Sequence, residues 1–104
     1  DLLATSELIN LAAFGSANNA AYGAVGLASQ QAVTQGTGFT EIHDTGYATP
    51  ATEIETEWQI NDNSVDCSWT TASNAGFVVL EMKASIAVDL PYQPWMQRGQ
   101  VLAQ

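Results

Sequence analysis

Basic side chains are almost absent from this chain of 104 residues, which has 2 Lys or Arg against 11 Asp or Glu. The formal net charge is −9 with histidine neutral. Lys83 and Arg98 cannot neutralise the row of phosphates on which nucleic-acid affinity depends, and an anionic membrane surface repels an acidic chain. We therefore expect no nucleic-acid partner, and membrane contact only through a segment upstream of Asp1, if the parent protein has one.

Cysteine is nearly absent too. The single Cys67 excludes an intrachain disulfide and any multi-cysteine zinc or iron–sulfur site. Cys67 alternates in phase with Val65 and Trp69, which predicts a buried thiol that behaves as a small hydrophobic group. A disulfide to a second chain stays open as an alternative. We expect no cofactor and no bound metal.

Catalytic motifs are missing as well. The chain has no Gly-x-Ser-x-Gly and no complete phosphate-binding glycine pattern. His43 is the only histidine, and Glu41 or Asp44 could be its acid–base partner or, for Glu41, a second metal ligand. A solvated loop histidine is the simpler interpretation, so we expect no catalytic residues and no enzyme.

The first third of the chain predicts a helix. Apolar and small residues recur there at steps of three or four, the spacing of one helix face: Leu11, Phe14, Asn18, Ala21, Val25, Ala28 and Ala32. Three glycines oppose this interpretation, because each costs roughly 1 kcal/mol in a helix relative to Ala. We expect residues 1–35 to form one long helix whose small residues Ala12, Gly15, Ala20 and Gly23 form an assembly contact.

The remaining residues, 36–104, predict an antiparallel sheet. Thr52 to Ile60 alternates in polarity, Asn61 to Asn63 has turn chemistry, and Val65 to Thr70 alternates again as a returning strand. A longer strand runs from Phe77 to Leu90, with every even position apolar. The predicted fold is a single α+β domain with the N-terminal helix packed on an antiparallel meander of about three to four strands.

Two surfaces of this sheet are candidate contacts. Glu53, Glu55 and Glu57 form a row on the face of a strand that we expect to be wet. The row could prevent pairing between sheets, receive a basic partner, or bind a cation loosely. Near the C-terminus, Tyr92 and Trp95 flank a proline and could either contact a partner or cover the end of the sheet core.

Two segments resemble the TadE-like pseudopilins of tight-adherence (Tad) pilus systems. Residues 8–21 (LINLAAFGSANNAA) keep the rhythm of Asn, paired Ala and Gly-small, and residues 84–94 (ASIAVDLPYQP) have the look of the family's closing strand and Pro-aromatic-x-Pro turn. The usual arginines of the Ala-Gly stretch are absent. The resemblance implies a bacterial envelope protein without catalytic residues, whose helix packs against other pilin helices.

These observations predict a non-catalytic structural subunit of an extracellular or cell-envelope filament, with other copies of itself or related subunits as partners. A virion or other surface shell is one alternative. A small acidic module that binds a basic partner or a cation is another, and a small enzyme built on His43 is the third.

Overall fold

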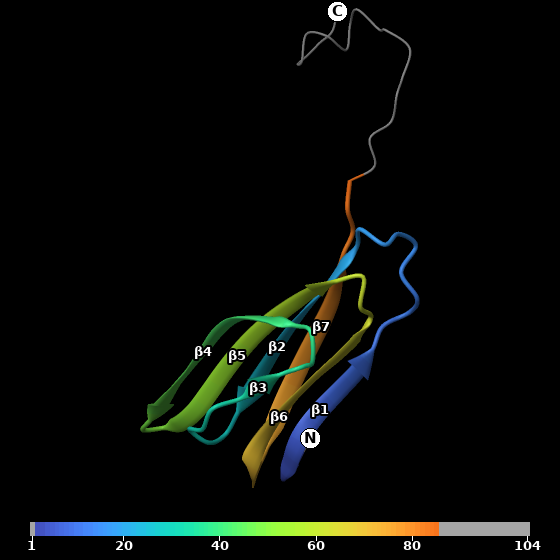
Figure 1. Ribbon diagram of the computed structural model, residues 1–104. Helices are drawn as coiled ribbons and strands as arrows, with labels where there is room; N and C mark the ends of the chain where they lie inside the picture. The colour runs from blue at the N-terminus through green and yellow to red at the C-terminus, as the bar shows by residue number, and fades with distance from the viewer. Residues whose placement is uncertain (1, 86–104) are drawn as a thin grey trace, which may run out of the picture.

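The computed structural model describes residues 2–85 as a sandwich of two antiparallel sheets (Figure 1). The three-stranded sheet has the order β1-β6-β3, and the four-stranded sheet has the order β4-β5-β2-β7. The strands are β1 (Ala4–Asn10), β2 (Ala20–Leu27), β3 (Thr34–Gln35), β4 (Thr40–Ala48), β5 (Ala51–Ile60), β6 (Ser64–Ser73) and β7 (Ala75–Met82). Only β4 and β5 are joined as a hairpin within one sheet, so every other connection carries the chain across the sandwich.

The predicted N-terminal helix is wrong. The first third of the chain contains β1, a connection between the sheets, and β2, and residues 2–85 contain no helix. β2 is an inner strand that pairs with β5 on one side and β7 on the other. Its small residues also fit period two, because Ala21, Gly23, Val25 and Leu27 all point into the sandwich. Pairing on both edges outweighs any helical preference of this segment.

Close packing of the two sheets explains one of the glycines. A Cβ atom on Gly23 would lie 2.9 Å from Cγ1 of Val65 on β6. Val65 is completely buried. The glycine that a helix would have disfavoured is therefore required by the distance between the sheets.

The predicted strands around residues 52–60 and 65–70 are confirmed as β5 and β6. Their connection is not the expected hairpin, because β5 and β6 lie in different sheets. The residues before β5 form a further strand of the same sheet, β4. The meander is thus replaced by two sheets, and the part of the long last strand beyond Ser85 lies outside the described residues.

The apolar core fills one half of the interior. It lies between β2 of the larger sheet and β6 of the smaller one, in two clusters: Val25, Leu27, Val33, Cys67 and Trp69, and Ala21, Phe39 and Val65. Phe77 on β7 packs against both clusters. The Trp69 indole nitrogen donates a hydrogen bond of 2.8 Å to the Ala4 carbonyl, which ties β6 to the start of β1.

The other half of the interior lies under β4 and β5. It is covered by β3 and the loop on either side of β3, and its side chains are acidic. Within residues 2–85 no helix exists that could cross a membrane.

Candidate functional site

The acidic half of the interior is built on β5. Glu53, Glu55 and Glu57 alternate with outward-facing residues and point into the sandwich, where their exposed fractions are 7%, 0% and 0%. The expectation of a wet face is therefore wrong. The three glutamates do share one face of β5, but that face is buried, and the apolar residues between them face the solvent.

The segment around β3 supplies backbone donors to this row. The Gln31 N–H donates to Oε2 of Glu53 at 3.1 Å, and the Val33 N–H donates to Oδ2 of Asp44 at 3.0 Å. The Gly36 N–H lies 3.4 and 3.5 Å from the two carboxylate oxygens of Glu57. One short stretch of backbone thus donates to three carboxyl groups, two from the row and one from β4.

Glu55 sits in the middle of the row without such a donor. Neither of its carboxyl oxygens has a hydrogen-bond partner, although both are buried. Burial is the main cause that raises the pKa of Glu55 to about 9, and the neighbouring Glu57 carboxyl acts in the same direction. A protonated carboxyl can donate to a carboxylate, whereas two carboxylates cannot hydrogen-bond to each other, so a proton on Glu55 lets it lie against Glu57.

The neighbouring carboxyl groups follow the same rule. Burial also raises the pKa of Glu53, and a hydrogen bond to Asp44 adds to the shift. The pKa of Glu57 is raised by burial, while the hydrogen bond from Glu55 acts in the opposite direction. Two carboxyl groups of the row thus have their raised pKa beside a second carboxyl, Glu53 beside Asp44 and Glu55 beside Glu57.

The row does not form a ligand set for a metal. Among residues 2–85, no three side chains of His, Cys, Asp or Glu are arranged to hold an ion. The arrangement can store protons in the interior. A basic partner cannot reach Glu55 or Glu57 without opening the sandwich.

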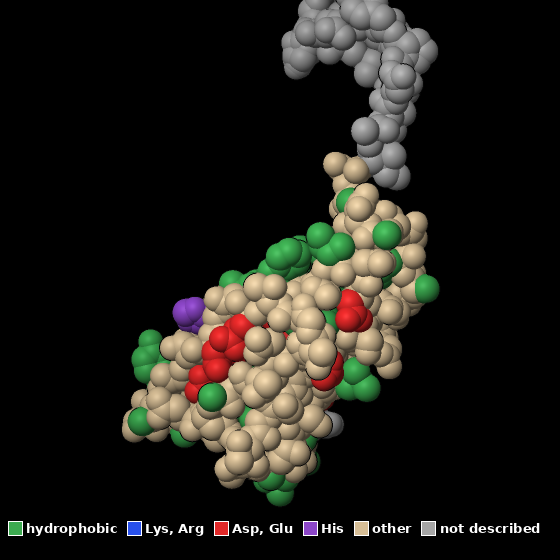
Figure 2. Space-filling model, viewed as in Figure 1, with side chains coloured by type: hydrophobic (Ala, Val, Ile, Leu, Met, Phe, Trp, Pro, Cys, Tyr) green, Lys and Arg blue, Asp and Glu red, His purple; other side chains and the backbone are tan. Residues whose placement is uncertain are grey.

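The outer face of the four-stranded sheet is the reverse of the row. Its large apolar side chains are exposed: Tyr47 72%, Val78 66%, Ile60 51%, Ile54 49%, Leu80 47% and Met82 42%. The register places no carboxylate among the outward residues of the four strands. In Figure 2, acidic side chains gather over β4 and β5, while a band of hydrophobic side chains runs along the upper edge of the same view.

The predicted assembly contact is not brought together. Ala12 and Gly15 lie exposed in the connection between β1 and β2, whereas Ala20 and Gly23 are buried in β2. The helical face that they were expected to share does not exist. Tyr92 and Trp95 lie outside the described residues.

The predicted acid–base group is also divided. A bulge in β4 between Glu41 and His43 puts His43 opposite Thr56 on the outer face, while Asp44 stands opposite Glu55 on the inner side. His43 is exposed in a strand and not in the expected loop. The imidazole and the Asp44 carboxylate therefore face opposite sides of the sheet.

Cys67 lies where its alternation predicted. Its exposed fraction is 1%, and burial raises the pKa of the thiol to about 12. A protonated, buried thiol is a poor nucleophile and cannot reach a second chain while the sandwich stays closed. The open alternative of an interchain disulfide is thus removed for the folded domain.

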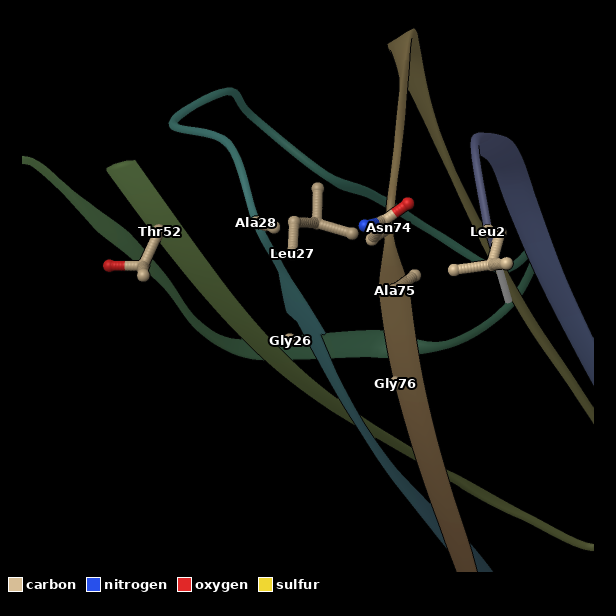
Figure 3. Close-up of a pocket in the computed structure, with 8 residues that line it drawn as sticks. All are labelled: Leu2, Gly26, Leu27, Ala28, Thr52, Asn74, Ala75 and Gly76. Carbon is tan, nitrogen blue, oxygen red and sulfur yellow. The ribbon is translucent and has the colours of Figure 1, made fainter. Parts of the chain in front are cut away.

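Two hollows stand out on the surface of residues 2–85. One of 510 Å³ lies at the end of β2 and the start of β7, with Leu27, Ala75 and Gly76 on these strands, Ala28 just after β2 and Leu2 just before β1 (Figure 3). The other, of 410 Å³, is lined by the β1–β2 connection together with Glu81 and Lys83. Neither hollow includes His43 or any member of the buried acidic row.

Sequence reasoning missed the partners of the row. Asp44 was considered only as a partner for His43, and the backbone donors around Val33 lay in the supposed helix and the loop after it. The sequence held one indication of these partners. It has 2 Lys or Arg against 11 Asp or Glu, so the three glutamates of the row have almost no basic side chains to pair with. Shared protons are the remaining way to hold such groups close together.

Comparison with known proteins adds no relative. No family model, no curated protein and no solved structure matches the chain.

Proposed function

We propose that this domain is a non-catalytic building block of an assembly in the cell envelope or outside the cell. It docks onto copies of itself or related subunits through the outer face of the four-stranded sheet. The observation that carries the proposal is an apolar face without carboxylates on a chain whose net charge is −9.

Exposure and charge both favour docking at this face. Contiguous exposed apolar side chains on a soluble domain mark an interaction surface. Ile54 and Leu80 are half exposed on strands separated only by β2, so the apolar residues form one surface across the sheet. Elsewhere, like charge opposes the approach of a second acidic subunit.

The composition supports a place outside the cytoplasm. The chain is low in charge, has 1 cysteine, and is rich in Ala, Thr, Asn and Gln. A pilus subunit and a subunit of a virion or other surface shell both fit this composition. The TadE-like resemblance remains a prediction. Its implied helix packing over the first third is not retained, because that segment forms β1 and β2.

The test is the native size of the tagged chain in the organism that encodes it. Extracellular and envelope fractions are run on native gels for the wild type, for Ile54→Thr with Leu80→Thr, and for the control pair Ser68→Thr with Thr70→Ser on exposed positions of β6. We expect the wild type and the control in a large complex, and the outer-face variant released from that complex. A monomeric wild type, or an outer-face variant that stays in the complex, would overturn the proposal.

A further inference from the structure

The four edge strands of the sandwich are not equally protected against pairing. Natural proteins protect sheet edges with very short strands, bulges and charged side chains. In the three-stranded sheet, β3 has only 2 residues and β1 has an irregular register between Ala4 and Ser6. In the four-stranded sheet, β4 has a bulge and three charged or titratable side chains, Glu41, His43 and Asp44.

β7 is the exception. Its 8 residues pair with β2 in an unbroken register, without a bulge and without proline. No other described strand pairs with its second edge. The only charged side chain within β7, Glu81, accepts a hydrogen bond of 2.6 Å from the Asn19 amide nitrogen. Apart from Glu81, which points inward, the part of this edge from Gly76 to Met82 has none of the features that protect the other edges.

We infer that a second copy of this chain pairs with β7, so that the two four-stranded sheets join into one continuous sheet across a two-fold axis. This inference rests on the proposed function, because it names a second copy of the chain as the first subunit with which the domain assembles. An antiparallel pair centred on Val79 keeps outward side chains together, with Val78 opposite Leu80 of the second copy. Aliphatic cross-strand pairs of this kind stabilise a sheet.

Charge favours β7 as the place of contact. β4 is the other long edge strand and carries Glu41 and Asp44 beside the acidic row, so two copies that met there would bring several carboxyl groups close together. Next to β7, Lys83 follows the last residue of the strand and offsets Glu81. In a chain with 2 basic residues, this is the edge at which two copies repel each other least.

The single open edge also limits the assembly. Two-fold pairing at β7 uses both open edges at once, so the joined sheet ends in two protected β4 strands. The product is a closed dimer and not an endless sheet. Both outer faces then lie side by side and offer one broad apolar surface for further docking.

Sedimentation velocity of the purified full chain over a wide concentration range tests the inference. Val78→Lys places a charge on the β7 edge, and Tyr47→Lys places the same charge on the same face at the β4 edge. Both side chains are mostly exposed in the single chain, 66% and 72% respectively. We expect a dimer for the wild type and for Tyr47→Lys, and a dissociation constant about tenfold higher or more for Val78→Lys, because the two lysines lie close across the two-fold axis. Amide exchange in β7 should quicken with that variant.

Several outcomes would overturn the inference. If Val78→Lys and Tyr47→Lys weakened the dimer equally, the outer faces would be stacked on each other. If neither variant weakened the dimer, the interface would lie elsewhere. A monomeric wild type with slowly exchanging β7 amides would show that residues 86–104 of the same chain occupy the edge. If the purified chain is a monomer but joins a complex in the cell, only the pairing of two copies at β7 is refuted. If no complex forms in the cell either, the proposed function is refuted as well.

Discussion

β5 and β6 lie in opposite sheets of the sandwich, and their alternating residues are oriented in opposite ways. β6 puts Val65, Cys67 and Trp69 inside and its polar residues outside. β5 puts Glu55 and Glu57 inside at 0% exposure and leaves Ile54 half exposed. The two strands have equally clear alternation in the sequence, yet only one of them follows the usual orientation.

The orientation of β5 buries carboxyl groups and exposes apolar side chains. A carboxyl group is buried at a high cost unless it is neutral or hydrogen-bonded. The backbone donors around β3 and the shared protons reduce that cost under β5. The apolar residues displaced by the row are left on the outside, where a partner can cover them.

The largest expected effect separates the two strands directly. Val65→Asn on β6 buries an unpaired amide in the apolar core and should lower the free energy of unfolding by about 3–5 kcal/mol. Ile54→Asn on β5 replaces a half-exposed side chain and should cost about 1 kcal/mol or less. Urea denaturation of both variants measures the difference. A larger loss of stability for Ile54→Asn than for Val65→Asn would show that Ile54 faces the interior of the sandwich.

The next effect is the pH dependence of stability. Folding raises the pKa of Glu55 from 4.5 to about 9, so between these values the folded chain keeps a proton that the unfolded chain releases. Stability is therefore greatest below pH 4.5 and falls as the pH rises toward 9, by about 1.4 kcal/mol per pH unit for each retained proton. Burial of Glu53 and Glu57 acts in the same direction. Urea denaturation at a series of pH values measures the slope.

A matched pair of variants assigns that slope. Glu55→Gln removes the buried titrating group and should flatten the pH dependence while raising stability at alkaline pH. Glu41→Gln makes the same substitution at an exposed position of β4 and should leave most of the slope. Stability that stays constant or increases between pH 5 and 9 in the wild type would contradict protonated carboxyl groups in the interior.

A smaller effect tests the distance between the two sheets where β2 packs on β6. Gly23→Ala forces a Cβ atom against buried Val65 and should lower stability by about 1–3 kcal/mol. Gly26→Ala on the same strand meets nothing within 4 Å and should be neutral or slightly stabilising. Thermal unfolding compares the two. Equal effects would mean that β2 does not pack on β6 as described.

The smallest effect concerns Cys67, whose alkylation needs no change of sequence. Burial and a pKa of about 12 keep the thiol protonated, so it should resist a thiol reagent at pH 8 in the folded domain and react once urea unfolds it. Mass spectrometry counts the modified chains. Rapid modification of the folded protein would place β6 at the surface.

The alternation in β5, β6 and β7 could be found from the sequence because period two is a local property. It identifies which residues share a face, but it does not state which face meets the other sheet. For β6 the usual assumption of an apolar interior was correct. For β5 it failed, because the side that faces inward depends on the neighbouring carboxyl groups and on donors such as the Val33 N–H, which come from a distant part of the chain. In β7 both faces have apolar residues, so the alternation alone does not show that Phe77 and Val79 face inward.

The error over β2 has a different origin. A segment rich in Ala and Gly fits a helical spacing and an alternating one equally well, and neither pattern is decisive. The glycine penalty pointed away from a helix, but only the position of Val65 shows why Gly23 is needed. Pairing with β5 and β7 is a long-range property that no local pattern contains.

Titration of the glutamate side-chain carboxyl carbons by NMR tests the central claim most directly, since it reports each group of the inverted strand by itself. We predict that Glu55 stays protonated through neutral pH and titrates near 9. A Glu55 carboxyl that titrates near 4.5 would contradict the account, because it would place the row in water and the apolar residues of β5 inside.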